Sequence, residues 1–535
     1  MKKFQTKTLF LLTIVLISII GGVLVIYSTA NGPWGYTDPV AYISTARSLA
    51  NGQGLGYYEA DAAFKVYTIQ PPFYSIVLSA FGLFRINLVV AARWLNIFAF
   101  VASIFIAGWI LFRFSRVPAL GIIASAMLCV FPFMVVMSSS AYSEPLFILL
   151  CLSGGLYLLY YLQHEKLYEL ILCSLLFGVL PLTRYAGIAM IISAGLSILL
   201  FSSGKTWSRV KKAILFVIVA SLPILAWLGW VYLSTAHSIG GRSLELNLGS
   251  LAAQFQAFRG IFMDTVWKWV PFQSHKTLLR YIVRFIIMGI GLVIILILSI
   301  FAERRIRKAS AEDAINSGIR IFAFFGLSSL IFIGVLIATY LFTLPTIDID
   351  NRMFLPFYVC TIMNLLGGVA LWHFAWFKGR MQILQIVPWL IAVICVVWYI
   401  PQTLNQMEFY HAGDGLTAYH WDHSAIVQAV RAVPSDKPVI SNDWELLMLW
   451  TGRPIHGFWY NFPLEPLQKT MYGTDPRDNT QSIFCRQGGV LVIFNDFPSQ
   501  FINHVGASYK DQWSNMFEGL SVFGVYSDGT IYLCH

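Results

Sequence analysis

Charged residues are scarce in this chain. Only 12% of the 535 residues are Asp, Glu, Lys or Arg, whereas 57% are hydrophobic. Soluble domains average about 25% charged and 45–50% apolar residues, so a single water-soluble core is excluded, and so is disorder. Acidic residues are fewer than basic ones, with 26 Asp and Glu against 36 Lys and Arg. In a soluble protein the net charge of +10 would suggest a nucleic-acid partner. In a chain this apolar, the excess of positive charge is first compared with the uneven distribution of Lys and Arg across the loops of a membrane protein.

Several motifs of cofactor chemistry are also missing. The sequence has no P-loop, no Rossmann glycine motif, no C-x₂-C metal spacing and no internal repeat. Among the seven cysteines, five fall in apolar runs and are predicted to be packing residues: Cys129, Cys151, Cys173, Cys360 and Cys395. Cys485 and Cys534 lie in the C-terminal region and are candidates for a disulfide.

Long apolar runs are abundant, and each helix across a bilayer needs about 20 apolar residues. We predict eleven membrane-spanning helices, at 8–28, 86–112, 117–138, 144–162, 168–182, 186–202, 211–234, 280–302, 318–343, 353–376 and 382–401. The first follows three lysines and lacks a small-residue cleavage site, which predicts an uncleaved anchor. The fifth and sixth are short and flank Arg184, so they are two short helices or one long kinked helix.

The distribution of positive charge predicts the orientation. The predicted cytoplasmic segments are 1–7, 113–117, 163–167, 202–212, 303–320 and 377–381. They hold 17 of the 36 basic residues and, with Glu169 beside them, five of the 26 acids. These segments therefore carry about +12 and the rest of the chain about −2. Because Lys and Arg concentrate in cytoplasmic loops, the N-terminus is predicted inside and the C-terminal region outside. Two crossings at the fifth and sixth spans fit this rule, and no nucleic-acid partner is expected.

The predicted domains are a membrane domain over 1–401, with outer loops at 29–85 and 235–279, and an extracytoplasmic α/β domain over 402–535. In the second domain we expect a helix at 424–433, a helix at 444–451 capped by Asp443, and a hairpin turn at Asp528-Gly529. The expected strands are 438–441, 489–494, 520–526 and 530–534. The fold class is thus an α-helical polytopic membrane protein with a small outer α/β domain.

Two carboxylates stand near the outer ends of predicted spans. Asp38 precedes Pro39, which predicts an N-cap and a helix on the membrane surface that runs to about Ala50. Glu144 follows Ser143 at the start of a span, where Ser143 would cap the helix and Glu144 would favour its dipole. A fixed carboxylate at the membrane surface is also a candidate functional group, so both interpretations stay open.

The outer face also carries candidate cations. Arg184 either reaches to the interface or is a fixed cation for a phosphate group, and Arg352 occupies a similar place. Asp348 and Asp350 could hold a divalent cation, although acids in a loop usually face water. A rigid turn into a re-entrant or surface helix is predicted from Pro71, Pro72 and Tyr74.

In this order, these pieces resemble the GT-C superfamily of membrane glycosyltransferases, in particular the protein-mannosyltransferase-like and aminoarabinose-transferase-like enzymes of bacteria. The motifs are Asp38-Pro39-Val40-Ala41-Tyr42, Pro71-Pro72-Phe73-Tyr74, Ser143-Glu144-Pro145, Leu182-Thr183-Arg184-Tyr185 and Arg352-Met353-Phe354-Leu355-Pro356. Met353 departs from the usual aromatic residue of the last motif. The resemblance covers nearly the whole chain in layout.

The resemblance implies a hexosyl or pentosyl transferase of the cell envelope, placed in the plasma membrane. Its donor would be a polyprenyl-phosphate sugar, and its acceptor an extracytoplasmic lipid, glycan or protein. Asp38 would be the general base of an inverting transfer, with Glu144 assisting it. Arg184 and Arg352 would bind the lipid phosphate. The only candidate cofactor is a divalent cation, which Asp348 and Asp350 could bind.

Two other classes fit the composition. A lipid or glycan transporter, or flippase, would place charges near the middle of the membrane and repeat its halves. Here the candidate charges gather at one face and no repeat is visible. A non-catalytic membrane assembly protein would use the C-terminal domain for binding and leave Asp38 as a helix cap alone.

Overall fold

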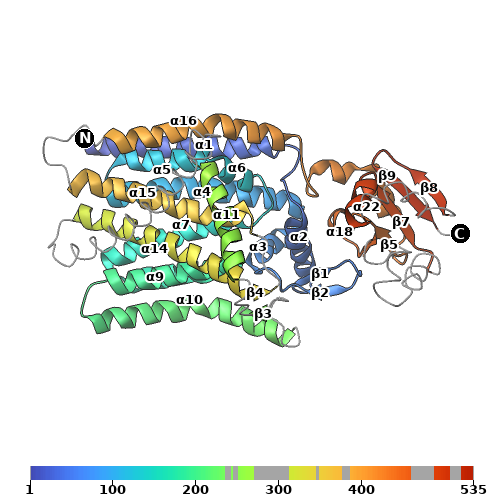
Figure 1. The fold of residues 1–535 in the computed structure, drawn as a ribbon, viewed down its shortest axis with the longest axis horizontal. Coiled ribbons are helices and arrows are strands. Elements are labelled where there is room, and N and C mark those ends of the chain that lie inside the picture. Colours follow the sequence, from blue (N-terminus) through green and yellow to red (C-terminus); the bar gives the residue numbers. More distant parts are fainter. Residues whose placement is uncertain are drawn as a thin grey trace. The chain divides into compact units, whose positions relative to one another are not determined.

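The computed structural model describes residues 2–234, 243–244, 251–269, 313–344, 349–375, 386–458, 487–505 and 520–533 (Figure 1). The chain divides into two compact units. The helical unit comprises Met1–Ser28, Thr68–Tyr74 and Trp94–His411, and the mixed unit comprises Thr29–Tyr67, Ser75–Arg93 and Ala412–His535.

The helical unit is built from long apolar helices. They are α1 (Lys2–Ser28), α4 (Leu88–Ser115, which begins in the mixed unit), α5 (Pro118–Val130), α6 (Pro132–Ser138), α7 (Glu144–His164), α8 (Leu167–Thr183), α9 (Ile188–Phe201), α10 (Thr206–Ser234), α11 (Leu251–Trp269), α14 (Asp313–Phe342), α15 (Leu355–Ala375) and α16 (Ile386–His411). Short elements are η1 (Tyr185–Gly187), η3 (Asn351–Phe354) and a ribbon of β3 (Ser243–Leu244) with β4 (Thr343–Leu344). Within the described residues, seven helices are long and apolar enough to cross a membrane, and the bent pair of α5 and α6 makes an eighth. The protein is therefore a multi-pass membrane protein.

Ten of the predicted spans coincide with these helices, and the predicted span 280–302 lies outside the described residues. Two breaks follow from proline and backbone geometry. The axis bends by 62° between α5 and α6 at Phe131, whose extended backbone is imposed by the following Pro132. The fifth and sixth spans are two helices, because α8 ends at Thr183 and Arg184 is extended, with φ −151° and ψ 131°.

Small residues bring the helices close together. A Cβ atom on Gly178 of α8 would lie 2.9 Å from the carbonyl oxygen of Ala220 in α10. Such close backbone approach is how helices associate in a membrane, where apolar side chains gain little from leaving lipid. A larger residue at Gly178 would push α8 and α10 apart.

The mixed unit holds a five-stranded sheet of order β6-β5-β7-β9-β8. Its strands are β5 (Val439–Ser441), β6 (His456–Gly457), β7 (Val490–Phe494), β8 (Ser521–Val525) and β9 (Gly529–Leu533). The first three are parallel, and β8 and β9 add an antiparallel hairpin. The helices of this part are η5 (Tyr419–His423), α17 (Ala425–Ala432), α18 (Trp444–Thr451) and α22 (Phe497–Val505). The α/β fold predicted for the C-terminal region is confirmed, but Asp443 makes no side-chain cap bond to α18.

Most of the first outer loop belongs to this unit as well. It forms α2 (Thr37–Ala50), a hairpin of β1 (Gly56–Tyr58) and β2 (Phe64–Val66), and most of α3 (Phe73–Leu83). Arg47 of α2 donates to the carbonyl oxygens of Met448 (3.1 Å) and Leu449 (2.5 Å) in α18. The backbone N–H of Leu416 donates to the Gly35 carbonyl at 2.7 Å. The division of the chain thus differs from the single boundary predicted after residue 401, and α16 continues to His411.

Candidate active site

A buried ion pair is the centre of the charged cluster in the helical unit. Oε1 of Glu144 lies 2.6 Å from Nη1 of Arg184. The Glu144 side chain is 0% exposed and that of Arg184 is 19% exposed. Neither oxygen of Glu144 accepts a hydrogen bond of good geometry from the described residues. A buried carboxylate needs a charged partner, and Arg184 supplies it.

The turn before α7 places Glu144. Pro145 occupies the start of the helix, where its missing N–H costs nothing, and Ser143 precedes it. The predicted side-chain cap by Ser143 is wrong, because its hydroxyl makes no cap bond. Instead Asn96 of α4 holds the turn by donating from Nδ2 to the carbonyls of Ser140 (2.7 Å) and Tyr142 (2.9 Å).

Arg184 lies where α8 ends and η1 begins. The next residue, Tyr185, donates its hydroxyl to the Thr68 carbonyl at 3.3 Å, and Nε1 of Trp227 donates to that hydroxyl at 3.2 Å. The short segment Thr68–Tyr74 is therefore tied to the helix break that carries Arg184. These bonds restrict the backbone from which the guanidinium extends.

The same short segment contains the predicted proline turn. Pro71, Pro72 and Tyr74 are buried, and α3 begins directly after the two prolines, as predicted. The Tyr74 hydroxyl donates to Oδ1 of Asn96 at 3.3 Å. Tyr74 thereby orients the amide that holds the turn next to Glu144.

Arg352 joins the cluster through an aromatic ring. Its guanidinium carbon lies 4.5 Å from the centroid of the Tyr142 ring, two residues before Glu144. Nε of Arg352 also forms an ion pair with Oδ2 of Asp350. The neighbouring Asn351 accepts a hydrogen bond from Thr265 of α11 at 2.6 Å. Part of the second outer loop, α11, thus supports the turn that carries Arg352.

Asp38 belongs to the mixed unit and lies in the first turn of α2. The helix begins at Thr37, and the N-cap residue is Tyr36, so the predicted N-cap role of Asp38 is wrong. The predicted end of the helix at Ala50 is confirmed. Thr37 bonds to Glu445 of α18 at 3.2 Å. Burial, together with the negative charge of Asp38, raises the pKa of Glu445. Asp38 is therefore close to another acid in its own unit, and the expectation that Glu144 assists it stays a prediction.

The described residues hold no group of three His, Cys, Asp or Glu side chains suited to a metal ion. Asp348 of the predicted metal pair lies outside the described residues, and Asp350 is occupied by Arg352. Both members of the predicted disulfide, Cys485 and Cys534, also lie outside the described residues.

Three polar residues of the cluster were assigned no role from the sequence: Asn96, Tyr142 and Tyr185. Asn96 is fully buried in a mostly apolar helix, and a buried amide in a membrane span is the signal that could have revealed it. Tyr142 and Tyr185 lie within two residues of a predicted charge, but aromatic residues are common at any membrane interface, so their type alone did not indicate a role.

Comparison with known proteins identifies the fold. No protein-family model and no curated protein sequence matches the chain. The crystal structure of ArnT from Cupriavidus metallidurans bound to undecaprenyl phosphate aligns with a TM-score of 0.55 at 12% identity, covering 97% of both chains. The apo structure of the same protein gives a TM-score of 0.48 at 14% identity, again over 97% of both chains. The chain therefore has the fold of ArnT, and its resemblance to the GT-C membrane glycosyltransferases is confirmed at the level of the fold.

Proposed function

We propose that the protein is a membrane glycosyltransferase that moves a sugar from a polyprenyl-phosphate donor to an extracytoplasmic lipid, glycan or protein. The observation that carries this proposal is the cluster of Glu144, Arg184 and Arg352, within a fold shared with a protein that was crystallised with undecaprenyl phosphate. The cluster offers guanidinium groups at helix ends, which is the chemistry that recognises a phosphate.

The arginines suit the leaving group. As the bond between the anomeric carbon and the phosphate oxygen breaks, negative charge grows on the polyprenyl phosphate, and fixed cations stabilise it. A guanidinium carries five N–H donors, so Arg184 can pair with Glu144 and still donate to a phosphate. Glu144 acts as a positioning residue, since it fixes the Arg184 side chain. Tyr142 positions Arg352 in the same way by stacking against it.

The reaction also needs a base. We assign this role to Asp38, which would take the proton from an acceptor hydroxyl or amine. The freed oxygen or nitrogen attacks the anomeric carbon from the face opposite the phosphate, so the new glycosidic bond has inverted configuration. The polyprenyl phosphate leaves with the electron pair of the broken bond. A carboxylate in the first turn of a helix is well placed for this task because its backbone is fixed.

The test is transfer by the full-length protein in membranes supplied with polyprenyl-phosphate sugars. Asp38→Asn keeps the size of the side chain and removes the base, so we expect transfer to fall by roughly 10²- to 10⁴-fold. Asp436→Asn, which neutralises an exposed acid of the same unit, is the control and should leave the rate unchanged. Full transfer by Asp38→Asn would reject the general-base role.

Loss of transfer in Arg184→Gln or Arg352→Gln, with product analysis of the anomeric configuration, would test the remaining assignments. We expect both variants to lose rate without changing the configuration of the product. Retention of configuration in the wild-type product would contradict the single-displacement reaction.

A further inference from the structure

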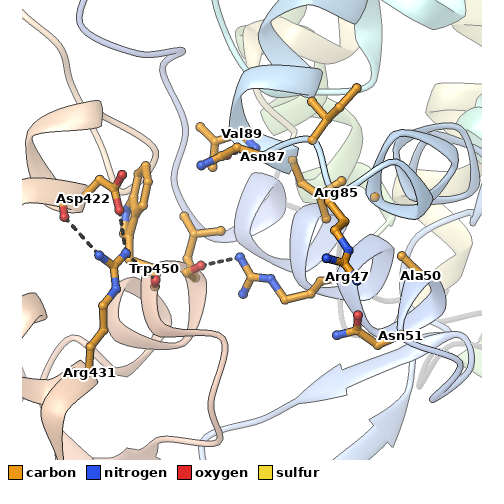
Figure 2. Close-up of a pocket in the computed structure, with 13 residues that line it drawn as sticks. Arg47, Ala50, Asn51, Arg85, Asn87, Val89, Asp422, Arg431 and Trp450 are labelled. Atoms are coloured by element: carbon orange, nitrogen blue, oxygen red, sulfur yellow. Dashed lines mark hydrogen bonds and ion pairs between the residues drawn. The ribbon is translucent and has the colours of Figure 1, made fainter.

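The mixed unit contains a cavity of about 280 Å³ that the proposed reaction does not use. Its walls come from the end of α2, the turn between α3 and α4, and the helices η5, α17 and α18, all within one unit (Figure 2). One water molecule takes up about 30 Å³ in the liquid, so the cavity has room for a group of several heavy atoms.

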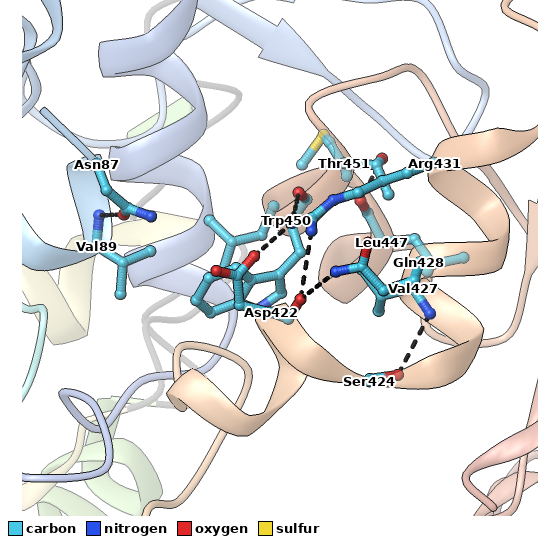
Figure 3. A network of polar contacts seen from close by, with 12 residues as sticks. Asn87, Val89, Asp422, Ser424, Val427, Gln428, Arg431, Leu447, Trp450 and Thr451 are labelled. Carbon is cyan, nitrogen blue, oxygen red and sulfur yellow. Dashed lines mark hydrogen bonds and ion pairs between the residues drawn. The ribbon is translucent and has the colours of Figure 1, made fainter. Parts of the chain in front are cut away.

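The charges around the cavity do not balance. Its walls carry three arginines, Arg47, Arg85 and Arg431, and a single acid, Asp422. Arg431 pairs with Asp422 at 2.5 Å and also donates to the Trp450 carbonyl at 2.8 Å (Figure 3). Within the described part of the chain, neither Arg47 nor Arg85 forms an ion pair with a carboxylate. The cavity therefore has two positive charges in excess.

Arg47 is held in place by neutral groups. Its two hydrogen bonds go to the carbonyls of Met448 and Leu449, near the C-terminal end of α18. Burial, together with the charge of Arg431, lowers the pKa of Arg47 to about 10, so it remains protonated at neutral pH. Bringing two guanidinium groups together under partial burial is unfavourable, and a bound anion would relieve that cost.

Further donors surround these cations. Asn51 follows α2, and Asn87 precedes the 28-residue helix α4. Oδ1 of Asn87 accepts from the backbone N–H of Val89 at 2.9 Å, which fixes the Asn87 amide beside the cavity (Figure 3). The positive end of the α4 dipole adds to the field of the arginines.

The rim beside Arg85 is apolar and open. Leu83, Phe84 and Ile86 are 69%, 80% and 43% exposed, and they flank Arg85 in the turn after α3. Exposed apolar side chains next to a basic cavity suit an amphiphile whose anionic head enters the cavity while its tail covers the rim.

From this arrangement we infer that the cavity is a binding site for a phosphate-type oxyanion, taken either as the headgroup of an anionic lipid or as a free anion. Arg47 and Arg431 form the fixed back of the site. Arg85 is exposed and makes no side-chain hydrogen bond to the described residues, so it is the cation that closes on the ligand. The site is independent of the proposed sugar transfer.

The experiment measures binding by the full-length protein with two probes. Inorganic phosphate is titrated at constant ionic strength, and phosphatidylglycerol is titrated into phosphatidylcholine nanodiscs. Arg85→Gln should weaken binding about tenfold or more, because one charge-assisted contact is lost. Arg85→Lys should retain part of the affinity. Lys437→Gln removes one positive charge from the same unit, away from the cavity, and should leave binding unchanged.

The two probes separate the sources of the oxyanion. Saturable binding of inorganic phosphate that depends on Arg85 supports a free-anion site. Binding of phosphatidylglycerol alone that depends on Arg85 supports a lipid headgroup. Absence of saturable binding with both probes overturns the inference, and so does an equal loss of affinity in Arg85→Gln and Lys437→Gln.

Discussion

Charged side chains are arranged differently in the two units. In the helical unit, the buried carboxylate of Glu144 is paired with a cation, Arg184. Two places in the mixed unit instead group like charges: three arginines share a cavity with one acid, and Asp443 lies beside Asp496 at the end of the parallel strands. Membrane helices cannot leave a buried charge unmatched without a large cost, whereas a domain in contact with water can. A charge paired with an opposite charge therefore fixes the geometry of the two side chains, whereas a group of like charges remains able to bind a ligand or a proton.

The largest expected effect comes from breaking a matched pair. Glu144→Gln removes the buried carboxylate that pairs with the Arg184 guanidinium and should lower the free energy of unfolding by about 3–5 kcal/mol. Thermal unfolding in detergent measures it. The control is Asp350→Asn, since the Asp350 side chain is 43% exposed and its pair with Arg352 should be worth less than about 1 kcal/mol. Equal losses in the two variants would contradict the contrast between buried and exposed pairs.

A smaller effect is expected from the acidic group of the mixed unit. Nε2 of Gln500 donates to Asp443 at 2.9 Å and to Asp496 at 2.8 Å. Burial and the neighbouring charge of Asp496 raise the pKa of Asp443 to about 7, and Glu445 adds to the repulsion. The folded state thus holds a proton that the unfolded state releases near pH 4. This contribution to stability is complete at pH 4 and below, and is lost as the pH rises to about 7.

Asp443→Asn should remove that pH dependence. We expect the variant to unfold at a higher temperature than the wild type at pH 8, and to show less change between pH 5 and pH 8. Unfolding of the full chain in detergent at both pH values provides the measurement. If the wild type becomes more stable from pH 5 to pH 8 and the variant does not, Asp443 is stabilised in its charged form and the assignment is wrong.

The smallest expected effect concerns the unmatched cation. Arg85→Gln should change the free energy of unfolding by less than about 0.5 kcal/mol, because the side chain is exposed and has no ion pair with a described residue. The same substitution should weaken oxyanion binding, so Arg85→Gln is expected to change binding without changing stability. A large loss of stability would mean that Arg85 is a structural residue.

The helical unit was largely predictable because its signals are local. Runs of apolar residues predicted ten spans that coincide with described helices, and the charge pattern favoured the break at Arg184 between two of them. The bend between α5 and α6 was not predicted. Each signal lies within about 20 residues of the element it specifies. The positions of Glu144, Arg184 and Arg352 at helix ends followed from the same local pattern.

What the sequence did not reveal depends on distant partners. Asp38 and Asp443 have the residue type of N-caps, yet Asp38 lies inside the first turn of α2, and Asp443 makes no side-chain cap bond to α18. The link between α2 and α18 joins Arg47 to carbonyls 401 and 402 residues away, which no local pattern encodes. Asn96 similarly acts through a turn 44 to 46 residues away.

The interleaving of the two units sets an order of events during synthesis. Arg93 is the last residue of the mixed unit before a stretch of 318 residues of the helical unit, and Ala412 resumes it. At 5–20 residues per second, the ribosome needs roughly 15 to 60 s to make that stretch. For this time α2 exists without α18, its later partner, and Arg47 has no carbonyls of α18 to bind. The first loop therefore lacks its contacts with α18 until the last segment of the chain is made. A ribosome that stalls before that point would leave α2 without these contacts.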